Sequence, residues 1–148
     1  MQHRFFTLFT LLVISFAVLT ACEKEPKKLI ARKWKFSYAE SMKALPADQR
    51  KKIEALPAEA QKRQREMMER LTFEFKADGS FTTSTGQANT QPETGTWSLT
   101  ADGKALIMKT GVLGMEQLIN IDELTEQRMI LNPQVGMKLK MAFIPVNP

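Results

Sequence analysis

From residue 71 onwards, the chain alternates apolar and polar positions with a period of two, which predicts half-buried β-strands. Leu71, Phe73 and Phe75 alternate with polar residues, and Asp78-Gly79 then predicts a tight hairpin turn. Further candidate strands follow at 80–85, 95–99, 105–108, 115–121, 128–131 and 137–143, of which 105–108 is a continuous apolar run typical of a buried strand. With an earlier run near residue 34, these segments make eight candidate strands, most of them joined by short links.

The first strand is predicted from about Lys33 to Glu40, where Trp34, Phe36 and Tyr38 recur at every second position. Sequential antiparallel strands joined by tight turns form a meander, and eight strands are enough to close a barrel. The strand–helix alternation that a parallel sheet requires does not occur in the sequence. The predicted fold class is therefore all-β: an antiparallel up-and-down meander or barrel of about eight strands, with a helical insertion after the first strand.

The predicted insertion, residues 43–70, has no aromatic residue and carries dense charges of both signs. Pro46 and Pro57 each stand two residues before an acidic residue, an arrangement typical of helix starts. We predict two helices, at about 46–55 and 57–70. One thin apolar stripe runs along them: Ile53, Leu56, Ala60, Met67 and Leu71. The insertion could simply pack this stripe on the domain, or it could serve as a lid or as a docking face for a protein partner.

Four features together carry a resemblance: the strand tryptophan Trp34, the hairpin at 71–81, Gly95-Thr96-Trp97, and Asp102-Gly103-Lys104. With them the chain resembles the lipocalin-like domains of Bacteroidetes lipoproteins, over about 29–145 apart from the insertion. The resemblance implies a barrel. It implies little chemistry, because members of this group are largely without assigned activity.

The N-terminus has the pattern of a secretory signal, because Arg4 precedes an apolar run from Phe5 to Val18. This run is shorter than the roughly 20 residues that a membrane-spanning helix needs. Leu19-Thr20-Ala21-Cys22 follows it and resembles the lipobox of bacterial lipoproteins. The resemblance implies that residues 1–21 are a signal peptide and that Cys22, as the first mature residue, carries a diacylglyceryl group on its sulfur.

Residues 22–28 are charged, contain a proline and are predicted to form a solvated tether between the lipid and a domain at 29–148. In the lipoprotein resemblance, an aspartate directly after the lipidated cysteine marks retention in the inner membrane, and here that position is Glu23. This favours a lipid anchor in the outer membrane, on its periplasmic face or at the cell surface. The membrane, reached through the lipid on Cys22, is thus a predicted partner.

Composition excludes several classes of function. The formal net charge is +5, and the basic residues are interleaved with acidic ones, so no nucleic-acid partner is predicted. The only histidine, His3, leaves with the signal, and the only cysteine is Cys22. A mature chain without histidine or a free thiol excludes Ser-His and Cys-His catalysis and zinc sites built from these residues. We predict no catalytic residue, no metal site and no cofactor, and we predict that the protein is not an enzyme.

The candidate ligand-binding residues are aromatic and methionine side chains expected to face inward: Trp34, Phe36, Tyr38, Phe73, Phe75, Trp97, Met108 and Met141. Such side chains line adaptable apolar sites, but the same set also describes a packed core. Three hypotheses follow. The chain is a membrane-anchored module that takes a small apolar ligand, or an interaction or envelope-structural lipoprotein that docks a partner through 43–70, or an enzyme of carboxylate or lysine chemistry. We favour the first, because no acidic or basic residues are spaced for the third.

Overall fold

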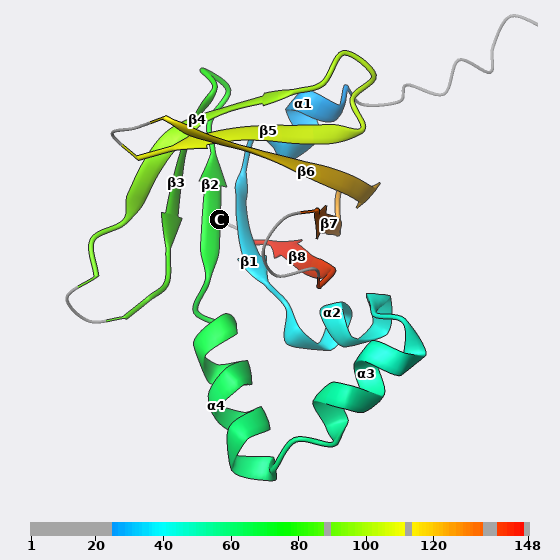
Figure 1. Cartoon of the computed structure of the whole chain (residues 1–148). Helices are drawn as coiled ribbons and strands as arrows, with labels where there is room; N and C mark the ends of the chain where they lie inside the picture. Colours follow the sequence, from blue (N-terminus) through cyan, green and yellow to red (C-terminus); the bar gives the residue numbers. More distant parts are fainter. Residues whose placement is uncertain (1–24, 88–89, 112–113, 135–138, 147–148) are drawn as a thin grey trace, which may run out of the picture.

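The computed structural model describes residues 25–87, 90–111, 114–134 and 139–146, within which eight strands form one closed barrel (Figure 1). The strands are β1 (Lys33–Phe36), β2 (Thr72–Phe75), β3 (Ser80–Ser84), β4 (Glu93–Leu99), β5 (Ala105–Thr110), β6 (Met115–Leu124), β7 (Met129–Pro133) and β8 (Met141–Pro145). Each pairs antiparallel with its neighbour in the sequence. The predicted all-β, up-and-down barrel is confirmed.

The barrel closes because β1 pairs with both β2 and β8. Trp34 lies opposite Phe73 on one side and Pro145 on the other, and Phe36 lies opposite Phe143. Closure leaves no unpaired sheet edge between the first and the last strand. The short strand β1 is therefore the element on which the integrity of the barrel depends.

Side chains that face the barrel interior pack into one buried cluster. Its members are Ile30, Trp34, Phe36, Phe75, Phe81, Trp97, Leu106, Met108, Ile119, Met129, Leu131 and Phe143. The rings of Phe75 and Trp97 meet edge-on, with their centroids 5.5 Å apart, a geometry that aromatic pairs favour. The Nε1 atom of Trp34 donates to the carbonyl of Ile30 at 2.9 Å, so this buried donor is satisfied.

Two aspartates hold the tight turns at one end of the barrel. Asp78 accepts hydrogen bonds from the Ser80 hydroxyl (2.6 Å) and backbone N–H (2.8 Å), which lower the pKa of Asp78. Asp102 accepts from the Thr100 hydroxyl at 2.6 Å, which likewise lowers its pKa. Gly79, which follows Asp78, has φ of +87°, which glycine adopts without steric cost. Both aspartates therefore hold turns, as their Asp-Gly context predicted.

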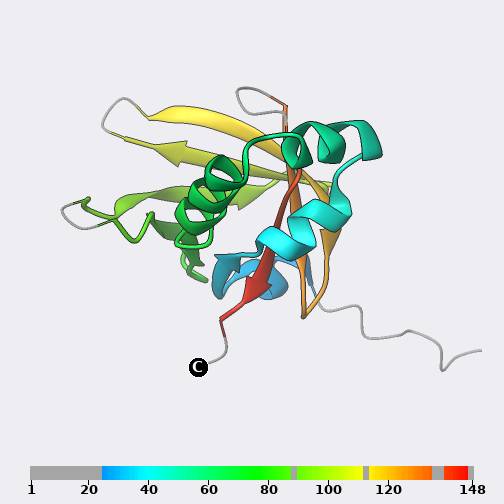
Figure 2. The ribbon, with the colours of Figure 1, turned by 90° about the horizontal axis from the view of Figure 1, so that it is seen from below.

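Four helices complete the described fold: α1 (Pro26–Ile30), α2 (Tyr38–Ala44), α3 (Ala47–Glu54) and α4 (Ala58–Met68). The predicted helices at 46–55 and 57–70 correspond to α3 and α4. The insertion nevertheless holds three helices rather than two, because the first strand ends at Phe36 and not at Glu40. Seen from below, α2, α3 and α4 lie across one end of the barrel (Figure 2).

The two ends of the domain also differ from prediction. Pro26 begins α1, so residues 26–28 belong to a helix and not to the solvated tether. Ile30 at the end of this helix is fully buried in the barrel core, which ties α1 to the barrel. The last strand runs over 141–145 rather than 137–143, and the predicted residues 137 and 138 lie outside the described residues.

Candidate ligand-binding site

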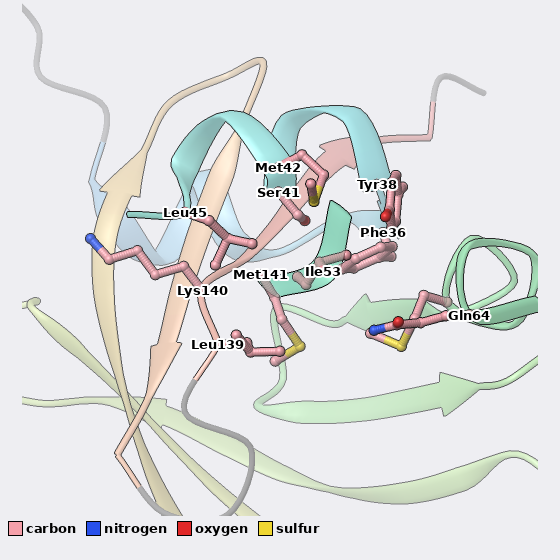
Figure 3. A pocket seen from close by; sticks show the side chains of 11 residues that line it. Phe36, Tyr38, Ser41, Met42, Leu45, Ile53, Gln64, Leu139, Lys140 and Met141 are labelled. Atoms are coloured by element: carbon pink, nitrogen blue, oxygen red, sulfur yellow. The ribbon is translucent and has the colours of Figure 1, made fainter. Parts of the chain in front are cut away.

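An apolar pocket lies at the end of the barrel where β1 ends and β8 begins, beneath α2, α3 and α4 (Figure 3). We call it the mouth pocket. Its lining residues are Phe36, Tyr38, Ser41, Met42, Leu45, Ile53, Gln64, Met68, Leu139, Lys140 and Met141. They come from the end of β1, all three helices of the insertion and the segment that leads into β8, so the pocket exists only in the folded chain.

Helix α2 is held firmly against the barrel. Ser37 caps its N-terminus, where its Oγ accepts a hydrogen bond from the N–H of Glu40 at 3.3 Å. One turn later, the Oγ of Ser41 accepts from the N–H of Ala142 in β8 at 2.8 Å. Ala142 is fully buried, as is Phe143 on the opposite face of the strand. Both faces of β8 are therefore covered at this point, one by the core and one by α2.

Replacing Ser41 by alanine is expected to lower the free energy of unfolding by about 1–3 kcal/mol, because it leaves the buried N–H of Ala142 without a partner. Ser41 is only 5% exposed, so water cannot take over the hydrogen bond. Urea unfolding measures the change. The matched control is Ser98→Ala in β4, where the serine is exposed and little change is expected. Equal effects of the two substitutions would contradict the role of Ser41.

A charged cluster joins α2 to the β6–β7 turn. Arg128 donates from Nε and Nη2 to the two carboxylate oxygens of Glu123, at 2.8 and 2.7 Å. Its Nη1 donates to Glu40 on α2 at 2.8 Å, and the Nζ of Lys43 donates to the other oxygen of Glu40 at 2.7 Å. These contacts raise the pKa of Arg128, through Glu123 first and then Glu40. They fix the position of α2 on the outside of the barrel.

Stability is expected to depend on pH through Glu40, whose pKa is lowered by the hydrogen bonds from Lys43 and then from Arg128. A carboxyl group with a lowered pKa in the folded state stabilises the protein above its unfolded-state pKa, and this contribution disappears as the pH falls through the folded-state value. Glu40→Gln should therefore destabilise the protein at about pH 7 and have little effect at about pH 3. Urea unfolding at the two pH values tests this, with the exposed Glu54→Gln as control. A difference that persists in acid would count against this role.

Helices α3 and α4 are held far less firmly, since neither contains a buried residue. Ile53, Gln64 and Met68 face the pocket, whereas Leu56 and Met67 are 41% and 51% exposed. The predicted apolar stripe was therefore wrong in its phase along α4. Met67 and Met68 are neighbours and point in directions about 100° apart on a helix. The packing of α4 on the barrel selects Met68 as the inward residue.

The mouth pocket is apolar and small. Its free space is about 30 Å³, which holds on the order of two water molecules, compared with several hundred Å³ in typical ligand sites. Three methionines with adaptable side chains line it: Met42, Met68 and Met141. The Nζ of Lys140 extends away from the pocket and contacts Asp122 at 2.7 Å (Figure 3). The side chains that surround this space favour an uncharged, apolar occupant.

The predicted ligand-binding residues fall into two groups. Phe36, Tyr38 and Met141 line the mouth pocket. The other five belong to the core cluster or pack against it, where they contact other side chains: Trp34, Phe73, Phe75, Trp97 and Met108. Tyr38 reaches the pocket as the first residue of α2, not as the inward-facing strand residue that was predicted.

Sequence reasoning missed the part of the site that α2 contributes, Met42 and Leu45. A signal for this helix is present, because Ser37 and Glu40 have the Ser-x-x-Glu spacing of a capping box. The alternation of Trp34, Phe36 and Tyr38 concealed it. Gln64 and Met68 carry no comparable signal, because only the packing of α4 directs them inward.

The comparisons with known proteins bear on the fold. No protein-family model and no curated protein matches the sequence. The structure is similar to the crystal structure of a DUF4847 family protein from Bacteroides vulgatus, with a TM-score of 0.51 and 14% sequence identity over 78% of this chain and 93% of that chain. At this identity the similarity shows a shared fold alone.

Two further findings concern the described residues. No three or more histidine, cysteine, aspartate or glutamate side chains among them are grouped so that they could hold a metal ion. None of the helices formed by these residues has the length and apolar character needed to cross a bilayer.

Proposed function

We propose that the protein is a non-catalytic lipoprotein with a lipocalin-like domain that binds the apolar part of a small ligand in the mouth pocket. The observation that carries this proposal is the combination of an apolar, methionine-lined space with two covering helices that bury no residue of their own. We further propose that α3 and α4 act as a lid. A chain without histidine after the predicted signal agrees with a role in binding.

The lid follows from the contrast between the helices. Ser41, Glu40 and the buried Leu45 hold α2 on the barrel. Beyond Leu45 the chain turns at Pro46 into α3 and at Pro57 into α4. Segments with few buried apolar contacts open at a small fraction of the global free energy of unfolding. The two outer helices can therefore move away while α2 and the barrel stay folded, and this motion enlarges the pocket.

The chemistry of the lining restricts the ligand. The hydroxyl of Ser41 is already hydrogen-bonded to β8, and the Nζ of Lys140 is paired outside the pocket. Tyr38 and Gln64 add only uncharged polar groups. Burying a charge without a partner is costly, so a carboxylate or an ammonium group would have to remain at the rim. The proposed ligand is therefore an uncharged apolar molecule, or the apolar tail of a lipid-like amphiphile whose polar group stays in water.

A pair of neighbouring methionines tests the site. Met68→Trp places a bulky ring in the mouth pocket and should weaken binding of the fluorescent apolar probe N-phenyl-1-naphthylamine about tenfold, or about 1.4 kcal/mol. Met67→Trp on the exposed face of the same helix is the matched control and should bind like wild type. Mass spectrometry of the natively purified protein would identify a co-purifying ligand. Equal probe binding by both variants would refute this site.

A second candidate function uses the outer surface of the same helices. Leu56 and Met67 are large apolar residues exposed on the insertion, as a face that docks a partner protein requires. In this case Met67→Trp, and not Met68→Trp, should reduce crosslinking of the protein to a partner in cells. The two substitutions therefore separate an internal ligand site from an external docking face.

A further inference from the structure

We propose that the barrel rests on the membrane with the end that carries α1, so that the mouth pocket opens on the opposite side, away from the bilayer that holds the lipid anchor. This inference rests on the proposed anchoring through Cys22. It adds an orientation of the domain and a direction from which the ligand arrives.

Helix α1 is fixed to the barrel. Ile30 is fully buried, and its carbonyl accepts the hydrogen bond from the indole of Trp34 at 2.9 Å. At the other end of α1, Pro26 lies at the β4–β5 turn, since a Cβ atom added at Gly103 would lie 3.6 Å from its Cγ. The position of Pro26 relative to the domain is therefore set by tertiary contacts.

The tether between Cys22 and α1 is short. Pro26 follows Cys22 by four residues, and a fully extended chain spans at most about 3.6 Å per residue. An acyl group on Cys22 therefore holds Pro26 within about 14 Å of the anchored residue. So short a connection cannot pass around the barrel to its other end.

The mouth pocket lies at the end of the barrel opposite α1. Strand β1 starts at Lys33 beside α1 and reaches the pocket at Phe36, and β8 leaves the pocket at Met141 and runs back. Figure 1 shows α1 at one end of the barrel and the helices of the insertion at the other. The seven-residue strand β4, tilted in the barrel wall, spans on the order of 15–20 Å between the two ends.

The chemistry of the α1 end suits a bilayer surface. Lys27 and Lys28 occupy the last turn of α1, where Lys28 pairs with Glu25 at 3.4 Å. The exposed Lys33 and Lys104 lie at the same end as Asp102. Val146, which is 40% exposed, donates its N–H to the carbonyl of Lys33 at 2.9 Å. Basic side chains near a membrane are attracted to anionic headgroups, and an exposed apolar residue beside Lys33 is compatible with the interface. The ligand then enters the pocket from the aqueous side, rather than directly from the bilayer that anchors the protein.

Single labels at the two ends test this orientation. Since Cys22 is the only cysteine, a thiol-reactive fluorophore labels the acylated, full-length protein only where a cysteine is introduced. Lys104→Cys places the label in the β4–β5 turn beside α1, and Leu56→Cys places it between α3 and α4, both at exposed positions. In vesicles of phosphatidylethanolamine and phosphatidylglycerol, a lipid-borne quencher should quench the label at 104 several-fold more strongly than the label at 56.

The outcomes separate the orientation from the function on which it rests. Equal or stronger quenching at 56 in vesicle-bound protein overturns the orientation and leaves the anchor and the pocket untouched. A protein that does not stay with the vesicles overturns the anchor, and the orientation with it. Inserting a long glycine-serine segment before Glu25 should abolish the difference between the labels, and a difference that survives would overturn the short tether as its cause. Probe binding by Met68→Trp and Met67→Trp tests the pocket independently.

Discussion

Replacing Trp34 by alanine is expected to lower the free energy of unfolding by about 4 kcal/mol, within the range for deletion of a large buried aromatic side chain. Trp34 is fully buried, and β1, on which it lies, joins β2 to β8. The indole N–H of Trp34 also donates a hydrogen bond to the carbonyl of Ile30. Because small domains are stable by only about 5–15 kcal/mol, this loss would bring the barrel close to unfolding. The midpoint of urea unfolding, followed by circular dichroism, measures the change.

Trp34→Phe separates the two contributions. It keeps an aromatic ring in the barrel core and removes the hydrogen-bond donor to the carbonyl of Ile30. The expected loss of unfolding free energy is therefore smaller, about 1–3 kcal/mol. A Trp34→Ala variant within about 1 kcal/mol of wild type would contradict the central role of β1 in closing the barrel. The same comparison reports on α1, because this helix packs through Ile30 on the same indole.

Replacing Cys22 by serine is expected to release the protein from membranes. Each buried CH₂ of an acyl chain contributes about 0.8 kcal/mol to membrane binding, and stable attachment requires two chains. A hydroxyl in place of the sulfur removes the site of the diacylglyceryl group, so the variant should move from the membrane fraction to the soluble fraction. Cys22 itself lies outside the described residues, and this prediction is drawn from the lipobox resemblance alone.

Glu23→Gln is the matched control, since it changes the neighbouring residue and keeps the sulfur. It should remain with the membranes and should incorporate a labelled fatty-acid analogue like wild type. Labelling of the Cys22→Ser variant to the same extent as wild type would show that the anchor lies elsewhere. It would also remove the basis of the proposed orientation of the domain.

The limits of prediction are clearest at Tyr38. Its spacing from Trp34 and Phe36 fits a strand, and hydrophobic periodicity alone extends β1 to Glu40. The local hydrogen bond from the N–H of Glu40 to the Ser37 side chain favours a helix instead. This helix places the Oγ of Ser41 where it accepts a hydrogen bond from the N–H of Ala142. Periodicity and capping gave competing signals, and contacts with a strand about a hundred residues away decided between them.

The mouth pocket shows the same limit. Phe36 and Met141 could be predicted as inward residues, because a strand directs alternate side chains to one face. Gln64 and Met68 could not, because α4 has few apolar residues and several rotations of this helix would satisfy its sequence. The rotation of α4 is fixed by its packing on the barrel, just before the chain passes into β2.

By itself, the sequence determined the number of strands, their order and the tight turns, since strand patterns and Asp-Gly turns are local properties of the chain. It also determined that the chain after its predicted signal contains no histidine. It did not determine where β1 ends or where β8 begins. Only the tertiary structure decided that β1 joins β8, that α2 covers the outer face of Ala142, and that the pocket lies beneath the insertion. These features depend on contacts between segments far apart in the chain, and such contacts form only when the whole barrel closes.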